Sequence, residues 1–479
     1  MSGPSVPPRE STSLSPPLDR KRRRTEYSLP RDCAYSIVSG SVMSNFSLLS
    51  QERAPFIRIP EPQNATYEIV ESTPGSQPKS LRVQLCGQTG AASKPQKVTL
   101  HHSCLTFTDL SLEDASRVPP DNNNSAWARA KRSPLSNMSW EGNDTPTVGQ
   151  VWIVVYAILT VHPELEVFRI TLDGTGSDIL AHQLEAVGLV VAHPAPSAPP
   201  GQPVPASDDH IGQLVVLRRS FWQGAGSPFG PRPIWVAGTD NRDISPSFES
   251  AFPPRALDYS LTTKFPTSRI HTTHPIRPAK PTPGSTIYSR YIPHLKETFS
   301  MVALDWTNEE HVNLFHVWQN DPRVAAGWNE TGTLEQHRAY LRNMHEDSHQ
   351  FPVLGKFDDT FFAYYEIYWA KEDAIGPYYE AGDFDRGRHF LVGDARFRGP
   401  HRVKAWHTCL THYMFLDDPR TNLVVGEPRA TGAKVLAYDQ ANGFHINKLI
   451  DLPHKRAALI MCPREKFFQD PPFEYKESS

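Results

Sequence analysis

The sequence predicts an α+β protein, and two observations on its 479 residues support this fold class. Short apolar segments rich in aromatic and β-branched residues predict strands, as at 361–368. Longer amphipathic segments predict helices, as at 334–344, where Thr333 and Gln336 form the capping pattern of a helix start. Both kinds of segment occur in each half of the chain.

Length and composition divide the chain into four parts. At 479 residues it exceeds the usual limit of a single core, so more than one domain is expected. Residues 1–30 are rich in Ser, Pro and Arg and predict a disordered tail. Residues 31–255 predict an α+β domain with loop insertions, 256–289 a proline-rich linker, and 290–479 a compact second domain.

The N-terminal domain is expected to consist mostly of strands. Two stretches, 119–146 and 193–205, have too little apolar content for a core and are expected to be surface excursions. No phosphate-binding loop or acid–base pair stands out in this domain. The expected strands are 56–59, 67–70, 81–85, 97–100, 151–159 and 214–217, and the expected helix is 178–187.

The C-terminal domain is expected to begin with a strand and two helices and to end with a pair of strands. The expected strands are 299–304, 351–355, 361–368, 389–395, 423–427, 444–446 and 457–460. The expected helices are 309–318, 334–344, 403–415 and 433–442.

The most informative segment is 387–402, where an apolar strand runs into a loop with three arginines and a helix follows directly. The free N–H groups of a first helical turn and the positive end of the helix dipole favour an anion at such a junction. Gly399 allows close backbone approach to a ligand, and Arg396, Arg398 and Arg402 add positive charge. The segment therefore predicts a site for a cofactor that carries phosphate groups.

Charge and cysteine usage exclude several classes of protein. The near balance of 49 basic and 52 acidic residues argues against a nucleic-acid binder that depends on phosphate contacts. The five cysteines are odd in number and without a CxxC pair, which favours reduced thiols in an intracellular protein. The longest apolar run, 151–161, is too short to span a bilayer, so no membrane partner is expected.

The two ends of the sequence favour a cytosolic location. The basic run 21–24 has no apolar stretch behind it, so a secretory signal is not expected. Two interpretations of that run stay open, a nuclear address and a solvated tail. The last residues do not form the peroxisomal tripeptide.

The order of elements and the anion loop resemble the GNAT superfamily of acyl-CoA-dependent N-acyltransferases. The loop Arg396-Phe-Arg-Gly399-Pro-His401 is similar to the family's cofactor loop, and Tyr438 precedes Gly443-Phe444 at the family's spacing. The resemblance implies a mixed, mostly antiparallel sheet flanked by helices. It also implies that acetyl-CoA or another acyl-CoA is the co-substrate. The implied cofactor contacts are Arg396, Arg398, Gly399, Pro400, His401 and Arg402.

Further strings resemble the siderophore-biosynthesis branch of this superfamily, which acylates the hydroxylated side-chain nitrogen of ornithine or lysine. These strings are 365–369, 385–389, 426–431 and 451–456. Fungal hydroxyornithine acetyltransferases and transacylases of this branch are similar to the chain in carrying a degenerate N-terminal half, whereas aerobactin- and mycobactin-type members are single domains. Arg429 and Gly432 stand where the branch often has Asp and Asn, which puts the roles of those two residues in doubt.

The resemblance implies three catalytic residues, His389, Glu427 and Tyr438. The near-neutral pKa of an ordinary histidine suits His389 to accept a proton. Glu427 is expected to orient His389 or to hold the hydroxylamino group, and Tyr438 to protonate the departing thiolate. Structural interpretations stay open for each: a core histidine, a solvated carboxylate and a core tyrosine.

Four residues between two expected strands are candidates for the acceptor site. The carboxylates of Glu366, Asp383 and Asp385 are expected to bind the α-amino group of an amino acid, and Trp369 to cover its aliphatic stem. A polar loop with one buried tryptophan is the structural alternative. His407 and His412 are five residues apart on a helix and point in different directions, so no metal is expected.

The function expected from this resemblance is acetylation of N5-hydroxyornithine in hydroxamate siderophore synthesis. Alternatives are a transacylase with a bulkier donor such as anhydromevalonyl-CoA, an N6-hydroxylysine acetyltransferase, and an acyl-CoA-binding scaffold without activity. The expected partners are small molecules, without nucleic acid, and the sequence gives no oligomeric state.

Overall fold

The computed structural model describes residues 47–49, 56–60, 64–73, 78–88, 99–198, 200–204, 206, 210–228, 233–237, 259–261 and 273–476. Every element named below belongs to one compact unit, residues 46–479. The expected tail 1–30 and the basic run 21–24 lie outside the described residues.

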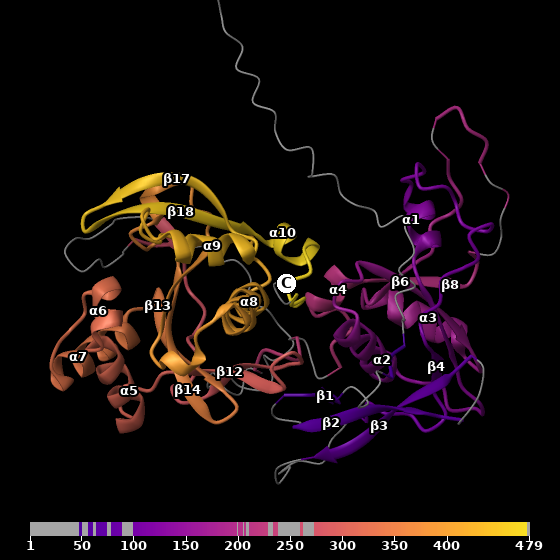
Figure 1. The fold of residues 1–479 in the computed structure, drawn as a ribbon, viewed down its shortest axis with the longest axis horizontal. Coiled ribbons are helices and arrows are strands. Elements are labelled where there is room, and N and C mark those ends of the chain that lie inside the picture. The colour runs from indigo at the N-terminus through magenta and orange to yellow at the C-terminus, as the bar shows by residue number, and fades with distance from the viewer. Residues whose placement is uncertain are drawn as a thin grey trace, which may run out of the picture. The chain divides into compact units, whose positions relative to one another are not determined.

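The N-terminal half of this unit is built on an eight-stranded sheet with the order β1-β2-β3-β4-β5-β6-β8-β7 (Figure 1). β5 and β6 pair in parallel, and the other neighbours are antiparallel. Its strands are β1 (Phe56–Arg58), β2 (Ala65–Glu71), β3 (Ser80–Gln88), β4 (Thr106–Thr108), β5 (Leu135–Ser139), β6 (Val167–Asp173), β7 (Val190–Ala192) and β8 (Gln213–Leu217). Its helices are α1 (Ala126–Arg132), α2 (Val148–Val161), α3 (Ser177–Ala186) and α4 (Arg218–Trp222).

The C-terminal half is built on a second eight-stranded sheet with the order β11-β12-β13-β14-β15-β16-β18-β17. Its strands are β11 (Thr286–Ile292), β12 (Glu297–Ala303), β13 (Gln350–Phe357), β14 (Thr360–Trp369), β15 (Arg386–Val392), β16 (Leu423–Gly426), β17 (His445–Leu452) and β18 (Lys455–Pro463). Its helices are α5 (Glu309–Gln319), α6 (Pro322–Trp328), α7 (Leu334–Glu346), α8 (Pro400–Asp417), α9 (Ala433–Ala441) and α10 (Arg464–Gln469). In the part of the sequence between β8 and β11, the short strand β9 (Tyr259–Leu261) pairs with β10 (Thr273–Pro275).

The two sheets have the same strand order, with the parallel pair at the same place in each. In the C-terminal sheet this pair is β15 and β16, and the remaining neighbours are antiparallel. α5, α6 and α7 lie on one side of this sheet, and α8 lies on the other (Figure 1). The α+β prediction, with a mostly antiparallel sheet and a related N-terminal half, is confirmed.

The expected strand 151–159 is wrong, because these residues belong to the helix α2. Thr147 and Gln150 form a capping box at its start, in which each side chain bonds the backbone of the other. Residues 149–159 of the helix are all buried. A segment that is apolar on all sides has no periodicity that separates a buried helix from a strand.

Three other expectations differ from the structure. The stretch 119–146 is only partly a surface excursion, because it contains α1 and the central strand β5. β11 begins at Thr286, inside the range expected to be a linker. Of the expected strand 97–100, residues 97 and 98 lie outside the described residues, and residues 99 and 100 form no strand.

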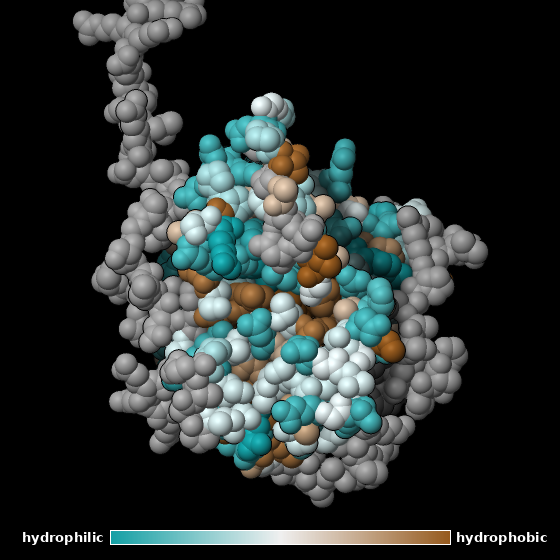
Figure 2. Space-filling model, turned by 90° about the vertical axis from the view of Figure 1, so that its right-hand side faces the viewer, coloured by the Kyte–Doolittle hydropathy of each residue, from teal (hydrophilic) through white to brown (hydrophobic). Residues whose placement is uncertain are grey.

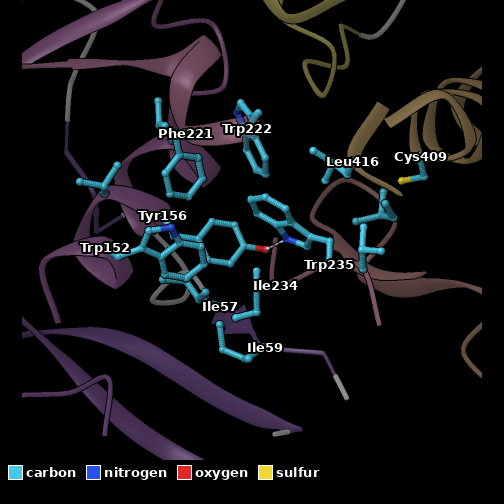
Figure 3. Packing of buried hydrophobic residues seen from close by; sticks show 14 of the residues in the cluster. Ile57, Ile59, Trp152, Tyr156, Phe221, Trp222, Ile234, Trp235, Cys409 and Leu416 are labelled. Atoms are coloured by element: carbon cyan, nitrogen blue, oxygen red, sulfur yellow. Dashed lines mark hydrogen bonds between the residues drawn. The ribbon is translucent and has the colours of Figure 1, made fainter. Parts of the chain in front are cut away.

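A buried aromatic cluster joins the two halves (Figure 3). The indole N–H of Trp235 donates to the Tyr156 hydroxyl at 3.5 Å, and the rings of Trp222 and Trp235 lie 5.0 Å apart. His412 of α8 contacts the same cluster, with its Nε2 atom 2.7 Å from the Trp222 carbonyl oxygen. Burial lowers the pKa of His412 to about 3, so the ring is neutral and donates to that carbonyl. The N-terminal half thereby supports the helix that follows the anion loop.

Figure 2 shows a face on which hydrophobic side chains lie between hydrophilic ones. Within the described ranges, no helix is long and apolar enough to cross a membrane.

Candidate active site

The two parallel strands at the centre of the C-terminal sheet separate after a short contact. β15 and β16 pair only at Arg386 with Val424 and at Gly387 with Val425. Beyond these pairs lie His389 on one strand and Glu427 at the end of the other. The divergence therefore opens a gap whose sides carry two of the predicted catalytic residues.

His389 bridges this gap and lies between two carboxylates. Its Nδ1 atom is 2.8 Å from Glu366 Oε2, and its Nε2 atom is 2.5 Å from Glu427 Oε1. Glu366 lies directly opposite His389 in the β14–β15 ladder, which places both side chains on the same face. Both carboxylates are buried, whereas 33% of the His389 side chain is exposed.

Three tyrosines fix the two carboxylates. The hydroxyl groups of Tyr340 and Tyr364 donate to Glu366 Oε1 at 2.7 and 3.0 Å. The Tyr368 hydroxyl donates to Glu427 Oε2 at 2.9 Å. Each carboxylate thus has one oxygen on His389 and the other on tyrosine, an arrangement that leaves the imidazole little freedom to rotate.

The two carboxylates keep His389 protonated. Burial opposes the charge, but Glu427 and Glu366 outweigh it and raise the pKa of His389 to about 10. The pKa of Glu427 is lowered: burial acts against this, but His389 and then Lys455 favour the carboxylate. The expectation of a near-neutral histidine is therefore wrong, because at pH 7 the ring is an imidazolium with both N–H groups already donated.

The start of α8 is prepared for an anion. Gly399 is its N-cap, with φ of 118°, and has no side-chain hydrogen bond to the first turn. Pro400 occupies the first turn, where its missing N–H costs nothing. A Cβ atom on residue 399 would lie 2.8 Å from the His401 ring. Because Gly399 has no side chain to cap the first turn, the N–H groups of this turn are available to a phosphate group.

The three arginines of the loop have different environments. Arg402 pairs with Glu297 of β12, so its predicted cofactor contact is already taken by a carboxylate. Arg396 pairs with Asp394 at 2.6 Å, and 78% of its side chain is exposed. Arg398 is exposed, and its side chain has no hydrogen bond or ion pair among the described residues. Of the three arginines, Arg398 is thus the one whose guanidinium can bind a phosphate without first leaving a carboxylate.

Tyr438 lies on α9 and is half-buried. No hydrogen bond joins its hydroxyl to another of the described residues, including His389 and Glu427. The neighbouring Asp439 is bound at 2.5 Å to Arg388 of β15, which fixes α9 against the strand. The helix that carries Tyr438 is therefore bound to β15, but Tyr438 itself is not part of the hydrogen-bonded group around His389.

The predicted acceptor-binding residues are engaged with other parts of the protein. Glu366 holds His389, as described above. The Asp383 carboxylate pairs with Lys371 at 2.6 Å, and Asp385 accepts from the Gly382 N–H at 2.9 Å. The structure does not bring these three carboxylates together as one head-group site.

Trp369 is likewise enclosed rather than open to a ligand. The guanidinium groups of Arg277 and Arg386 lie 4.5 and 4.1 Å from the centroid of its ring, and the residue is buried. The expected aromatic wall is therefore a packing element of the protein.

Several residues at the site were not predicted. These are Tyr340, Tyr364, Tyr368, Glu330 and Lys455. Lys455 Nζ is 3.5 Å from Glu427, and burial together with Glu366 raises the pKa of the Glu330 carboxyl. Tyr364 and Tyr368 stand two residues before and after Glu366 in β14, so all three side chains lie on one face of the strand. This spacing was the signal in the sequence that could have indicated the two tyrosines.

A groove of about 900 Å³ in this half lies elsewhere. It is lined by α5, the β13–β14 turn and the loop 393–396, and neither His389 nor Glu427 lines it. Among the described residues, no group of three or more His, Cys, Asp or Glu is arranged to hold a metal ion.

Comparison with known proteins gives consistent similarities. Residues 307–452 match the model of the acetyltransferase (GNAT) domain family. A hydroxyornithine transacylase of Ajellomyces capsulatus is 50% identical over 417 residues, covering 87% of this chain and 93% of the relative. An N(5)-hydroxyornithine:cis-anhydromevalonyl coenzyme A-N(5)-transacylase of Beauveria bassiana is 48% identical, covering 88% and 94%. A putative O-acetyltransferase of Stachybotrys chartarum is 45% identical, covering 88% and 93%.

Proposed function

The chain belongs to the siderophore-biosynthesis family of GNAT acyltransferases, and on this premise we propose that it acylates the N5 hydroxylamino nitrogen of N5-hydroxyornithine. The acyl donor is an acyl-CoA. The observation that carries the proposal is the His389–Glu427 pair across the gap between β15 and β16, beside a helix start that is not capped by a side chain.

The cofactor contacts proposed here are the first turn of α8 and Arg398. The pyrophosphate of an acyl-CoA accepts from the N–H groups of the turn, and Gly399 lets it approach. Arg398 adds charge without first breaking an ion pair. Arg396 and Arg402 contribute mainly by holding the loop through Asp394 and Glu297.

The proposed chemistry is direct transfer. The hydroxylamine nitrogen is neutral near pH 7 and attacks the thioester carbonyl, so that a C–N bond forms while the C–S bond breaks. Glu427 accepts a hydrogen bond from the hydroxylamino group and orients it. The proton that the nitrogen loses after the attack passes to solvent, and the coenzyme A thiolate leaves and takes up a proton. His389 and Tyr368 hold Glu427 in position, and Glu366 holds His389.

Tyr438 is proposed as the group that protonates the thiolate. Its hydroxyl has no competing bond among the described residues, and α9 is fixed to β15 by the Arg388–Asp439 pair. Because a thiolate is a good leaving group, this contribution is expected to be smaller than that of the His389–Glu427 pair.

Two acyl donors are candidates, acetyl-CoA and cis-anhydromevalonyl coenzyme A. The sequence favours acetyl-CoA, whereas the name of the Beauveria bassiana relative favours a cis-anhydromevalonyl donor. The name of the Stachybotrys chartarum relative adds the question of whether nitrogen or oxygen is acylated.

One experiment separates these possibilities. Purified protein is incubated with N5-hydroxyornithine, ornithine or N6-hydroxylysine and with each acyl-CoA, and the products are identified by mass spectrometry and NMR. The proposal predicts an N5-acylated hydroxyornithine that still carries its free N–OH group. Equal rates on ornithine and hydroxyornithine, or an O-acyl product alone, would contradict it.

A further inference from the structure

A cavity of about 140 Å³ lies between α2, β11 and the segment that follows α10. It is separate from the gap between β15 and β16, and the proposed transfer does not use it. Its volume is about ten times the roughly 10–15 Å³ that one water molecule requires, so it has room for a small organic molecule.

A buried cation with little compensation faces this cavity. Arg290 of β11 is only 5% exposed and lines the cavity. Its Nε donates to Cys409 Sγ at 3.4 Å, and its guanidinium lies 3.8 Å from the centroid of Phe473. Among the described residues, its two terminal nitrogens have no hydrogen bond and no carboxylate partner. A buried charge in proteins is normally paired, so this one calls for an anion.

One further cation, Arg58, lines the cavity, and the His294 ring is neutral. Arg58 lies over the ring of Tyr291 at 4.8 Å, and His294 stacks on Tyr475 at 4.4 Å. Burial lowers the pKa of His294, and the charge of Arg290 lowers it further. No Asp or Glu lines the cavity among the residues that the structure describes. Glu474, in the same segment as Tyr475, is bound to Lys476 at 2.9 Å.

We propose that this cavity binds a small carboxylate with an apolar body. Its carboxylate pairs with the terminal nitrogens of Arg290, whose planar fork matches that geometry. Its body lies against the apolar and aromatic lining, which includes Ile57, Leu159 and Phe473. An inorganic phosphate is less suited, because it has no apolar body to lie against Ile57, Leu159 and Phe473.

The test uses the full-length protein in a chloride buffer at constant ionic strength. Thermal melts and calorimetric titrations are recorded with acetate, butyrate, benzoate and phosphate. We expect butyrate or benzoate to raise the melting temperature by about 2 °C or more at saturation, since a ligand that binds only the folded state stabilises it. We expect phosphate to raise the melting temperature no more than chloride does.

Two variants locate the effect. Arg290→Met removes the charge, and it is expected to abolish the carboxylate shift while melting no lower than the wild type without ligand. Val161→Trp keeps the charge but fills the cavity from the end of α2, and it is expected to abolish the shift as well. Arg342→Met, at an exposed arginine of α7, is the control and is expected to keep it.

The proposal is overturned if no carboxylate shifts the wild type, if phosphate alone does, or if both variants retain the carboxylate shift. Should Arg290→Met fail to fold, Val161→Trp with the calorimetric titration decides the question alone. Acyl transfer by the same samples is followed separately, because its loss or retention concerns the gap at β15 and β16 rather than this cavity.

Discussion

The two halves of the molecule share one strand order but differ at the place where the parallel strands meet. β5 and β6 pair over five positions, from Leu135 with Arg169 to Ser139 with Asp173, whereas β15 and β16 pair over two. The following helix is closed by the Thr147–Gln150 capping box in the N-terminal half and is left without a side-chain cap at Gly399 in the C-terminal half. One architecture thus gives a closed, packed junction in one half and an open, anion-accepting one in the other.

A second difference concerns the face that carries His389. In the C-terminal half, α5, α6 and α7 separate β12 from β13, and Tyr340 of α7 reaches Glu366. In the N-terminal half, only residues 72–79 separate β2 from β3. Among the residues that the structure describes, the N-terminal half therefore has neither the gap nor the helices around it, and its aromatic cluster supports α8 instead. The comparison teaches that strand pairing and helix capping, rather than topology, distinguish the half to which we assign the cofactor.

The largest expected effect is on turnover at the open junction. Replacing His389 by Ala should lower kcat by roughly a hundredfold or more, the cost of misplacing a positioning group, because Glu427 loses the partner that holds it. The binding of acyl-CoA should change little. Steady-state rates and a thermal melt of the same samples separate chemistry from folding. His445→Ala, at an exposed histidine of β17, is the control; a His389 variant that turns over normally per folded molecule would return this residue to a structural role.

The next effect is on cofactor affinity. Gly399→Val should raise the dissociation constant of acyl-CoA by about tenfold or more, since a side chain at φ of 118° is strained and meets the His401 ring. Gly142→Val is the matched control: it lies in the corresponding loop after β5, has φ of 88°, and has open space around its Cβ position. Calorimetry on both variants checks the comparison, which fails if the two lose affinity equally.

Part of this account was accessible from the sequence. The anion loop, His389 and Glu427 could be predicted as candidates because strand-to-helix junctions and short motifs are local. The pairings of Arg402 with Glu297 and of Glu366 with His389 were not, because they depend on which strands lie side by side and in which register. The helix α2 was mistaken for a strand because its apolar residues cover all of its faces.

A smaller effect concerns pH. The pKa of His389 is raised from its ordinary value near 6.5 to about 10, so the imidazolium stabilises the fold fully below pH 6.5 and loses this contribution as the pH rises through 10. His389→Gln should lack this dependence, and the difference in melting temperature between the two proteins should therefore shrink from pH 7 to pH 10. A difference in melting temperature that grows over this range would mean that the two carboxylates do not stabilise the protonated ring.

The smallest effect is on the closed junction. Thr147→Ala should lower the free energy of unfolding by about 1 kcal/mol, since the variant loses the N-cap of α2. Cofactor affinity should be unchanged. Urea unfolding and calorimetry measure the two quantities, and gained acyl-CoA binding in this variant would show that the cap alone had closed the N-terminal half.

The stoichiometry of acyl-CoA binding tests the central claim most directly. Calorimetric titration of the full-length protein should give one site per chain, and Gly399→Val should weaken that site while Gly142→Val leaves it intact. Two sites per chain, or one site that is insensitive to Gly399, would contradict the assignment of the cofactor to the junction of β15, β16 and α8.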